Sequence, residues 1–177
     1  LIKSPVDIFY LEEKYKNNPP PFWKYTSGTS LKIGTIKESA LKLFNAINKK
    51  REIDLDRFLF SLGIRHLGLS SADLIANHYK SIDKMLKNIT IDNIEMSKQE
   101  LLSLDGIGEK VALSVIDFFQ NIDTRQLIIQ LIKSGVIVKQ YNKEVKETKI
   151  SNKMILITGT LKTMSRAEAK VKIELLG

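Results

Sequence analysis

A repeated pattern of apolar residues is the feature that most constrains the fold of this chain. When the chain is registered on Ala40, Ala72 and Ala112, apolar residues recur three, four and seven positions after each alanine. This spacing is typical of an amphipathic helix. Gly68 and Gly108 stand four residues before the second and third alanines. Each of these units is therefore predicted to place a short turn ahead of a helix.

The third unit shows the turn most clearly, because two glycines flank one apolar residue in Gly106-Ile107-Gly108. Leu101 and Leu104 predict a helix before this turn, and the pair Ser97 and Glu100 has the spacing of a capping box for its start. The glycines break that helix and allow a new one to begin. The pattern thus predicts two helices joined by a tight hairpin.

A hairpin of this kind has a specific physical use. Glycine tolerates positive φ and has no Cβ, so the backbone of Gly106 and Gly108 can approach a phosphate closely. The following helix presents unpaired N–H groups and the positive end of its dipole to that phosphate. Ile107 is expected to pack between the helices, while Lys110 adds a cation that holds DNA without reading its sequence. A single copy of this turn is also compatible with a purely structural helix-helix connection.

The second unit repeats the pattern from Ile64 to Gly68, with His66 where the first glycine would stand and Arg65 before it. Arg65 is a candidate phosphate contact. His66 has no nucleophile or carboxylate paired with it in sequence, which favours a turn residue or hydrogen-bond donor over a catalytic role. The first unit, Gly34 to Ile36, has lost the second glycine, so we expect it to pack without gripping DNA.

The composition agrees with a polyanionic partner and excludes several kinds of chemistry. The chain has 28 Lys and Arg against 20 Asp and Glu, a formal charge of +8 that favours binding to phosphates. It contains no cysteine and only two histidines, so neither a disulfide framework nor a thiolate zinc site is available. No P-loop, dinucleotide fingerprint or nucleophile elbow is present. We therefore expect no catalytic, cofactor-binding or metal-binding residue in this chain.

The C-terminal third of the chain changes character twice. Asp123 is predicted to cap one more helix, which Gly135 ends in a left-handed conformation. Residues 141–152 are charged and read as a linker. The apolar run from Met154 to Ile157 then predicts a strand, and a capping box of Ser165 and Glu168 predicts a following helix.

Four stretches of the chain resemble segments in the C-terminal half of bacterial NAD-dependent DNA ligases. Arg57 to Gly68 and Leu102 to Ala112 are similar to two helix-hairpin-helix segments of that family, and Leu1 to Phe9 resembles the segment that follows its first hairpin. Leu156 to Leu161 resembles the opening of its BRCT domain. The resemblance implies a mainly α fold, with a tandem helix-hairpin-helix domain in residues 1–140. It also implies a charged linker in 141–152 and a truncated α/β BRCT-like segment in 153–177.

The same resemblance implies a function. In that family the hairpins bind the minor-groove side of nicked duplex DNA, which the enzyme joins during replication and repair. The implied partners are duplex or nicked DNA and the other domains of the same ligase. No membrane partner is expected. The resemblance implies a monomer in the bacterial cytoplasm, near the nucleoid. The implied DNA-binding residues are Gly63, Arg65, His66, Gly68, Gly106, Ile107, Gly108 and Lys110.

The resemblance further implies that the chemistry lies outside this chain. NAD, magnesium and zinc belong to the parent enzyme, with none bound by these residues, and the nucleotidyltransferase domain is expected upstream of Leu1. The chain is thus expected to be a fragment cut at both ends. Two departures from the family pattern, at Asn17 to Leu31 and at Ile36, weaken the implied phosphate site of the first hairpin.

Two other functions remain open from the sequence. Nucleases and junction-processing complexes use the same hairpins in DNA-binding modules or subunits. A protein-interaction scaffold is the third reading, because the C-terminal segment is BRCT-like. Loss of DNA affinity on changing Gly108 and Lys110 would argue against the scaffold.

Overall fold

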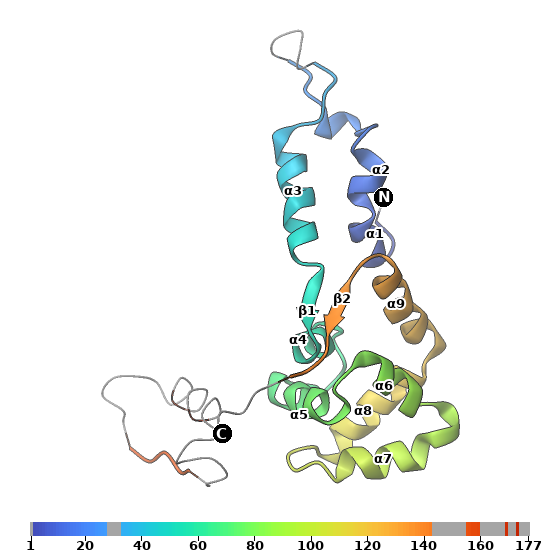
Figure 1. The fold of residues 1–177 in the computed structure, drawn as a ribbon, viewed down its shortest axis with the longest axis vertical. Coiled ribbons are helices and arrows are strands. Elements are labelled where there is room, and N and C mark those ends of the chain that lie inside the picture. The colour runs from blue at the N-terminus through green and yellow to red at the C-terminus, as the bar shows by residue number, and fades with distance from the viewer. Residues whose placement is uncertain (1, 28–32, 143–154, 160–168, 170–172, 174–177) are drawn as a thin grey trace. The chain divides into compact units, whose positions relative to one another are not determined.

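The structure is a computed structural model that describes residues 2–27, 33–142, 155–159, 169 and 173. The chain divides into two compact units, Leu1–Tyr141 and Asn142–Gly177. Within the described residues the first unit is mainly helical, with one small parallel sheet (Figure 1). The predicted fold class, a mainly α chain with tandem helix-hairpin-helix units, is confirmed.

Two helical hairpins form the larger part of the first unit. One hairpin pairs α4 with α5, and the other pairs α7 with α8 (Figure 1). Helix α6 and a short 3₁₀ turn, η2, connect the two hairpins, and α9 follows the second one. The bounds are α4 Leu55–Ser61, α5 Leu69–Tyr79, α6 Ile82–Asn88, η2 Ile91–Asn93, α7 Ile94–Leu102, α8 Glu109–Gln120 and α9 Ile122–Lys133.

One apolar core joins both hairpins. Ala72 and Ala112, the alanines that register the repeat, have no exposed surface, and neither do Ile75 and Val115, three residues after them. These residues belong to a single buried cluster that also holds Leu59, Met85, Leu101, Phe119 and Ile128. Because the same repeat positions of both units pack into one core, the two hairpins are parts of one folded body.

The N-terminal elements have a smaller core of their own. They are α1 Val6–Phe9, α2 Leu11–Tyr15, the 3₁₀ turn η1 Pro21–Trp23 and α3 Glu38–Lys49. Phe44 of α3 is 1% exposed, and its ring meets the edge of Trp23 at a centroid distance of 5.4 Å. Asn48 donates to Glu12 at 2.6 Å, which ties α3 to α2 as they lie side by side in Figure 1.

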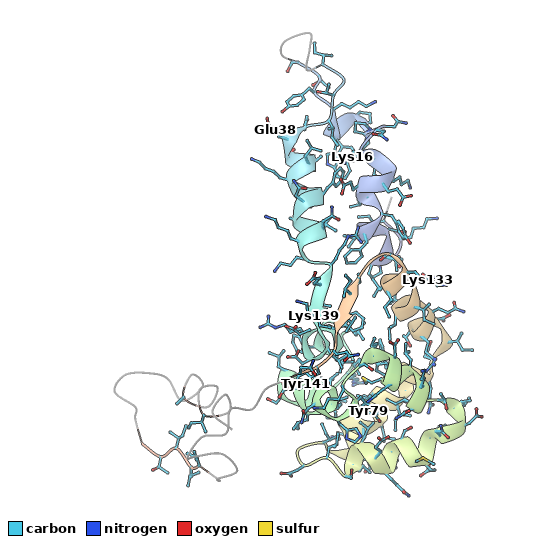
Figure 2. All side chains as sticks on the ribbon, viewed as in Figure 1. Lys16, Glu38, Tyr79, Lys133, Lys139 and Tyr141 are labelled. Carbon is cyan, nitrogen blue, oxygen red and sulfur yellow. The ribbon has the colours of Figure 1, made fainter. Side chains whose placement is uncertain are left out.

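A two-stranded parallel sheet connects segments that are distant in sequence. β1, Glu52–Asp54, pairs with β2, Ile137–Lys139, and Lys139 forms an ion pair with Glu52 at 3.0 Å. Beside the sheet, Arg51 donates to the carbonyls of Phe9 and Ser134 and to the side chain of Asn48. Tyr141, just beyond β2 and labelled in Figure 2, donates to Asp73 of α5 at 2.5 Å. The chain after α9 is thereby fastened back onto the hairpins.

The predicted capping box of Ser97 and Glu100 is wrong. Helix α7 begins at Ile94, so Ser97 lies inside it, 2% exposed, and its hydroxyl donates to the carbonyl of Asn88 at 3.1 Å. The η2 turn precedes α7 directly and delivers an apolar residue, Ile94, to the first helical position. Packing of that residue against the core sets the helix start, and the Ser-to-Glu spacing is coincidental.

The predicted cap of α9 is displaced by two residues. Asn121 accepts from the backbone N–H groups of Asp123 and Thr124 at 2.8 and 3.3 Å, and Asp123 lies in the first turn. The predicted end of this helix is confirmed, since Gly135 has φ +94°. Gly135 and Val136 donate to the carbonyls of Ile132 and Leu131, which is the Schellman arrangement.

The second unit is described at few positions. Ile155 to Gly159 carry no strand pairing, so the strand predicted for Met154 to Ile157 is not observed over its described residues. A strand needs a hydrogen-bonded neighbouring strand, and the strand pairing seen among the described residues is that of β1 with β2. Ala169 and Ile173 are helical, as predicted, and Ala169 is buried. The predicted linker from 143 onward and Ser165 and Glu168 lie outside the described residues.

Candidate nucleic-acid interface

The two hairpin turns have matching backbone geometry. His66 and Gly106 stand at equivalent positions and both have positive φ, +64° and +91°. Two residues later, Gly68 is the N-cap residue of α5 and Gly108 is that of α8. Gly68 has φ −83° and ψ 172°, and Gly108 has φ −86° and ψ 166°. The prediction that His66 occupies the place of the first glycine is confirmed in its backbone conformation.

The residue between these positions anchors each turn. Leu67 and Ile107 are 7% and 5% exposed, and both belong to the core that the hairpins share. The N–H of Leu67 donates to Ile64, and that of Ile107 donates to Leu104. Ile107 therefore packs between the helices as predicted, and its side chain faces the core and not the solvent.

Both hairpin helices begin without a side-chain cap. Neither Gly68 nor Gly108 can supply one, and both glycines are exposed. By contrast, Ser81 caps α6 and Asn121 caps α9 with side-chain oxygens. The first N–H groups of α5 and α8 are thus left for solvent or for a ligand, in the geometry that binds anions.

The two N-cap glycines are not required by the fold. Their backbone conformation is open to any residue, and a Cβ built on Gly68 or Gly108 would meet no atom within 4 Å. Gly106 differs, because its φ is +91° and an added Cβ would lie 3.0 Å from Leu74 Cδ1. Gly63 also has positive φ, +68°, and ends α4. The turns therefore contain two kinds of glycine, one needed for folding and one not.

Cationic side chains flank the uncapped helix starts. Arg65 and Lys110 are exposed, and neither forms a hydrogen bond or ion pair with any part of the chain that the structure describes. Glu109, between Gly108 and Lys110, pairs with Lys98 of α7 at 3.2 Å. This pair offsets the carboxylate at the start of α8, and the exposed Asp105, just before Gly106, is the other carboxylate of this turn.

The conformation of His66 yields a prediction for stability. Positive φ costs a residue with a Cβ about 1 kcal/mol, and glycine avoids that cost. We expect the free energy of unfolding of the His66→Gly variant to be about 1 kcal/mol higher than that of the His66→Ala variant, as measured by urea denaturation. The alanine variant is the matched control, because both changes remove the imidazole. Equal stability of the two variants would contradict the assigned conformation.

The turn at Gly34, ahead of α3, is built differently. Gly34 has φ +85° and matches His66 and Gly106 in register, but α3 begins one residue later than its counterparts, after Lys37. Ile36, in the place of the N-cap glycine, is half-buried and forms an antiparallel bridge with Lys24. A β-bridge thus occupies the position that an open glycine takes in the other two hairpins.

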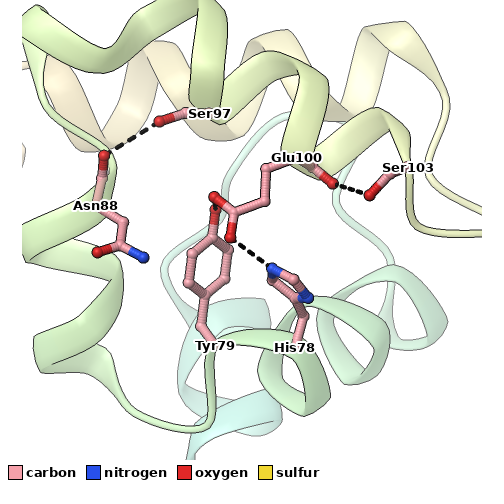
Figure 3. A network of polar contacts seen from close by, with 6 residues as sticks. All are labelled: His78, Tyr79, Asn88, Ser97, Glu100 and Ser103. Carbon is pink, nitrogen blue, oxygen red and sulfur yellow. Dashed lines mark hydrogen bonds and ion pairs between the residues drawn. The ribbon is translucent and has the colours of Figure 1, made fainter.

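A polar network between α5 and α7 escaped the sequence analysis (Figure 3). Glu100 accepts from Tyr79 at 3.1 Å through one carboxylate oxygen and lies 2.7 Å from His78 Nε2 through the other. Burial and the nearby carboxylate raise the pKa of Tyr79, so its hydroxyl remains a donor. A capping box would keep the Glu100 carboxylate at the start of its own helix, whereas the structure places it against two residues of α5.

Neither a metal cluster nor a membrane span is found among the described residues. No group of three or more His, Asp or Glu side chains in them is placed to hold a metal ion. None of their helices has the length and apolar character needed to cross a bilayer.

Comparison with known proteins agrees with the hairpin geometry. Residues 57–128 match the model of the helix-hairpin-helix motif, which includes both turns. Three relatives named DNA ligase align over the whole chain: those of Parvibaculum lavamentivorans at 37% identity, Rickettsia bellii at 35% and Rickettsia prowazekii at 34%. The chain spans about a quarter of the length of these relatives, 24% of the first and 25% of the other two.

Proposed function

We propose that the chain is a DNA-holding part of an NAD-dependent DNA ligase, because relatives named DNA ligase align with it along its whole length at 37% and 35% identity. The two hairpins hold the phosphate backbone of duplex or nicked DNA and do not read base sequence. The joining of nicks during replication and repair is the activity of the whole enzyme.

One observation carries the proposal: Gly68 and Gly108 are glycines that the fold does not need. Both start a helix, are exposed and leave open space where a Cβ would lie. A side chain at either position would stand beside the free N–H groups, whereas glycine leaves them accessible to a phosphate oxygen. Close approach of a phosphate explains why the same residue stands at both positions.

The remaining site residues have complementary roles in this proposal. The first N–H groups of α5 and α8 donate to phosphate oxygens, while Arg65, His66 and Lys110 add side-chain contacts at the rim. Gly63, Gly106 and Ile107 shape the turns and hold them against the core. Such contacts neutralise phosphates whatever the base sequence, so affinity depends on charge and on the geometry of the backbone.

The chemistry of nick joining is assigned to other parts of the enzyme. The chain has no cysteine for a zinc module, and no described cluster of ligands fits a magnesium ion. We infer that other parts of the enzyme hold the zinc and magnesium of such a ligase and its adenylated nucleophile, and no chemical step is assigned to the residues of this chain. The proposed setting is a monomeric enzyme acting on the chromosome in the cytoplasm, with this part contacting its other domains.

A salt titration tests the proposal. The 177-residue chain should shift a nicked duplex in a gel assay, with little preference among base sequences. With about four phosphates neutralised by the two hairpins, the slope of log affinity against log salt should be roughly −3 to −4. Binding that does not change with salt, or none at all, would refute the DNA-holding role. A nuclease or junction module is distinguished by adding the chain in trans to a purified adenylation domain, because only a ligase part restores sealing.

A further inference from the structure

Glu100 is the only carboxylate among the described residues that joins the two hairpins through side-chain contacts. It lies on α7, the first helix of one hairpin, and both of its partners lie on α5, the second helix of the other (Figure 3). Tyr79 is 2% exposed and donates to one carboxylate oxygen, while His78 Nε2 lies 2.7 Å from the other. The carboxylate therefore fixes α7 to α5 at two points.

A second contact joins the hairpins at the turn. The space beside Gly106 is filled by Leu74 of α5, whose Cδ1 would lie 3.0 Å from a Cβ at this position. Leu74 is five residues beyond Leu69, the first residue of α5, which corresponds to about 8 Å along the helix axis. The turn of one hairpin thus rests on the helix that begins at the turn of the other.

These two contacts lie at different positions along α5, because Leu74 is in the middle of the helix, about one turn before His78. Gly106 and Leu74 meet near the turn that holds the proposed phosphate site, while Glu100 meets His78 and Tyr79 at the far end of α5. A helix held at two points along its length cannot rotate freely against its neighbour. The α5–α7 junction therefore acts together with the shared core to set the spacing between the two uncapped helix starts.

We propose that Glu100 is a positioning residue for DNA binding, which holds the two hairpins at the separation at which both grip one backbone. This rests on the proposed function, and it adds a residue that does not itself contact DNA. Glu100 and His78 are each about a third exposed in their side chains, 31% and 32%. Such a pair contributes little to overall stability, so its loss loosens the junction without unfolding the chain.

The sign of the effect makes Glu100→Ala a sharp test. Removing a carboxylate raises the net positive charge, so electrostatics alone predicts tighter binding to DNA. Positioning predicts the opposite, because hairpins that shift from their fixed separation lose part of the advantage of simultaneous contact. The matched control is Glu95→Ala, which removes the same charge from an exposed position of the same helix. The Glu95 side chain forms no hydrogen bond or ion pair within the described residues.

The experiment measures affinity of the 177-residue chain for a nicked duplex across salt, together with thermal unfolding. We expect Glu100→Ala to weaken binding about 10-fold and to make the salt slope shallower by about one, the loss of one phosphate contact. Glu95→Ala should bind as tightly as the unchanged chain or more tightly. Glu100→Gln, whose amide can accept from Tyr79, should recover most of the affinity.

Three outcomes decide the inference. Equal or tighter binding by Glu100→Ala, with the parent chain showing the steep salt slope, overturns the positioning role and leaves the DNA-holding role intact. Absence of salt-dependent binding by the parent chain overturns both. If Glu100→Ala does not fold, His78→Ala takes its place with an expected loss of about threefold, and unchanged affinity in that variant also overturns the proposal.

Discussion

Replacing both N-cap glycines with aspartate, Gly68→Asp with Gly108→Asp, should abolish most DNA binding while leaving the fold as stable as before or more so. Aspartate is a favoured N-cap residue, and its carboxylate accepts from the free N–H groups and complements the helix dipole. The same carboxylate occupies the proposed phosphate position and repels the phosphate. We expect affinity for a nicked duplex to fall on the order of 1,000-fold, which is about 4 kcal/mol.

The control for this variant places the same charges on other helix starts. Ser81→Asp with Asn121→Asp adds two carboxylates at the caps of α6 and α9, which already have side-chain caps. It should lose far less affinity than the glycine variant, with thermal unfolding measured on both. Equal losses in the two variants would mean that net charge, and not the hairpin geometry, governs binding.

Replacing Arg125 with leucine should cause a large loss of stability, for reasons unconnected with DNA. Its guanidinium donates to the carbonyls of Leu86 and Ile89, at the end of α6, and to that of Phe119, near the end of α8, at 2.6, 2.9 and 3.0 Å. Leucine leaves three acceptors without a donor and removes a cation from two helix C-termini. We expect a loss of about 3 kcal/mol in the free energy of unfolding, measured by urea denaturation.

Two further variants separate this effect from a loss of charge. Arg57→Leu removes an exposed arginine with no hydrogen bond inside the described part of the chain, and its stability should change by less than about 0.5 kcal/mol. Arg125→Lys keeps the charge but not the planar fork that reaches several carbonyls, so an intermediate loss is expected. A loss below about 1 kcal/mol for Arg125→Leu would show that water replaces the guanidinium at little cost.

The sequence was most informative where local pattern and backbone requirement coincide. Registration on the alanines placed His66 opposite Gly106 and Gly68 opposite Gly108, and both pairs share their backbone conformations. The end of α9 at Gly135 was predictable for the same reason, since a glycine after a helical pattern satisfies a geometric need that few residues meet.

Helix starts were predicted less well, because several neighbouring residues can cap. Asn121 and Asp123 are both favoured N-cap residues, and the local sequence pattern does not decide between them. Ser97 and Glu100 have a capping-box spacing but fall within α7, where their side chains make contacts to Asn88 and to α5. A pattern of two residues cannot distinguish a cap from a position inside the helix.

Contacts between distant segments were not predictable at all. β1 and β2 are three residues each, too short for an alternating pattern, and Arg51 reaches carbonyls from both ends of the unit. The joining of α5 to α7 through Glu100 is of the same kind. These contacts depend on the packing of the whole unit, which the spacing of one segment does not encode.

The pairing of β1 with β2 also has a consequence for the order of folding. Each helical hairpin closes through neighbours in sequence, a fast event, whereas the parallel pairing joins segments with both hairpins between them. During synthesis the hairpins can therefore form before Ile137 leaves the ribosome, and the sheet completes the unit last. A kinetic trace of refolding should accordingly contain an early helical phase, with the ion pair of Glu52 and Lys139 forming in the final step.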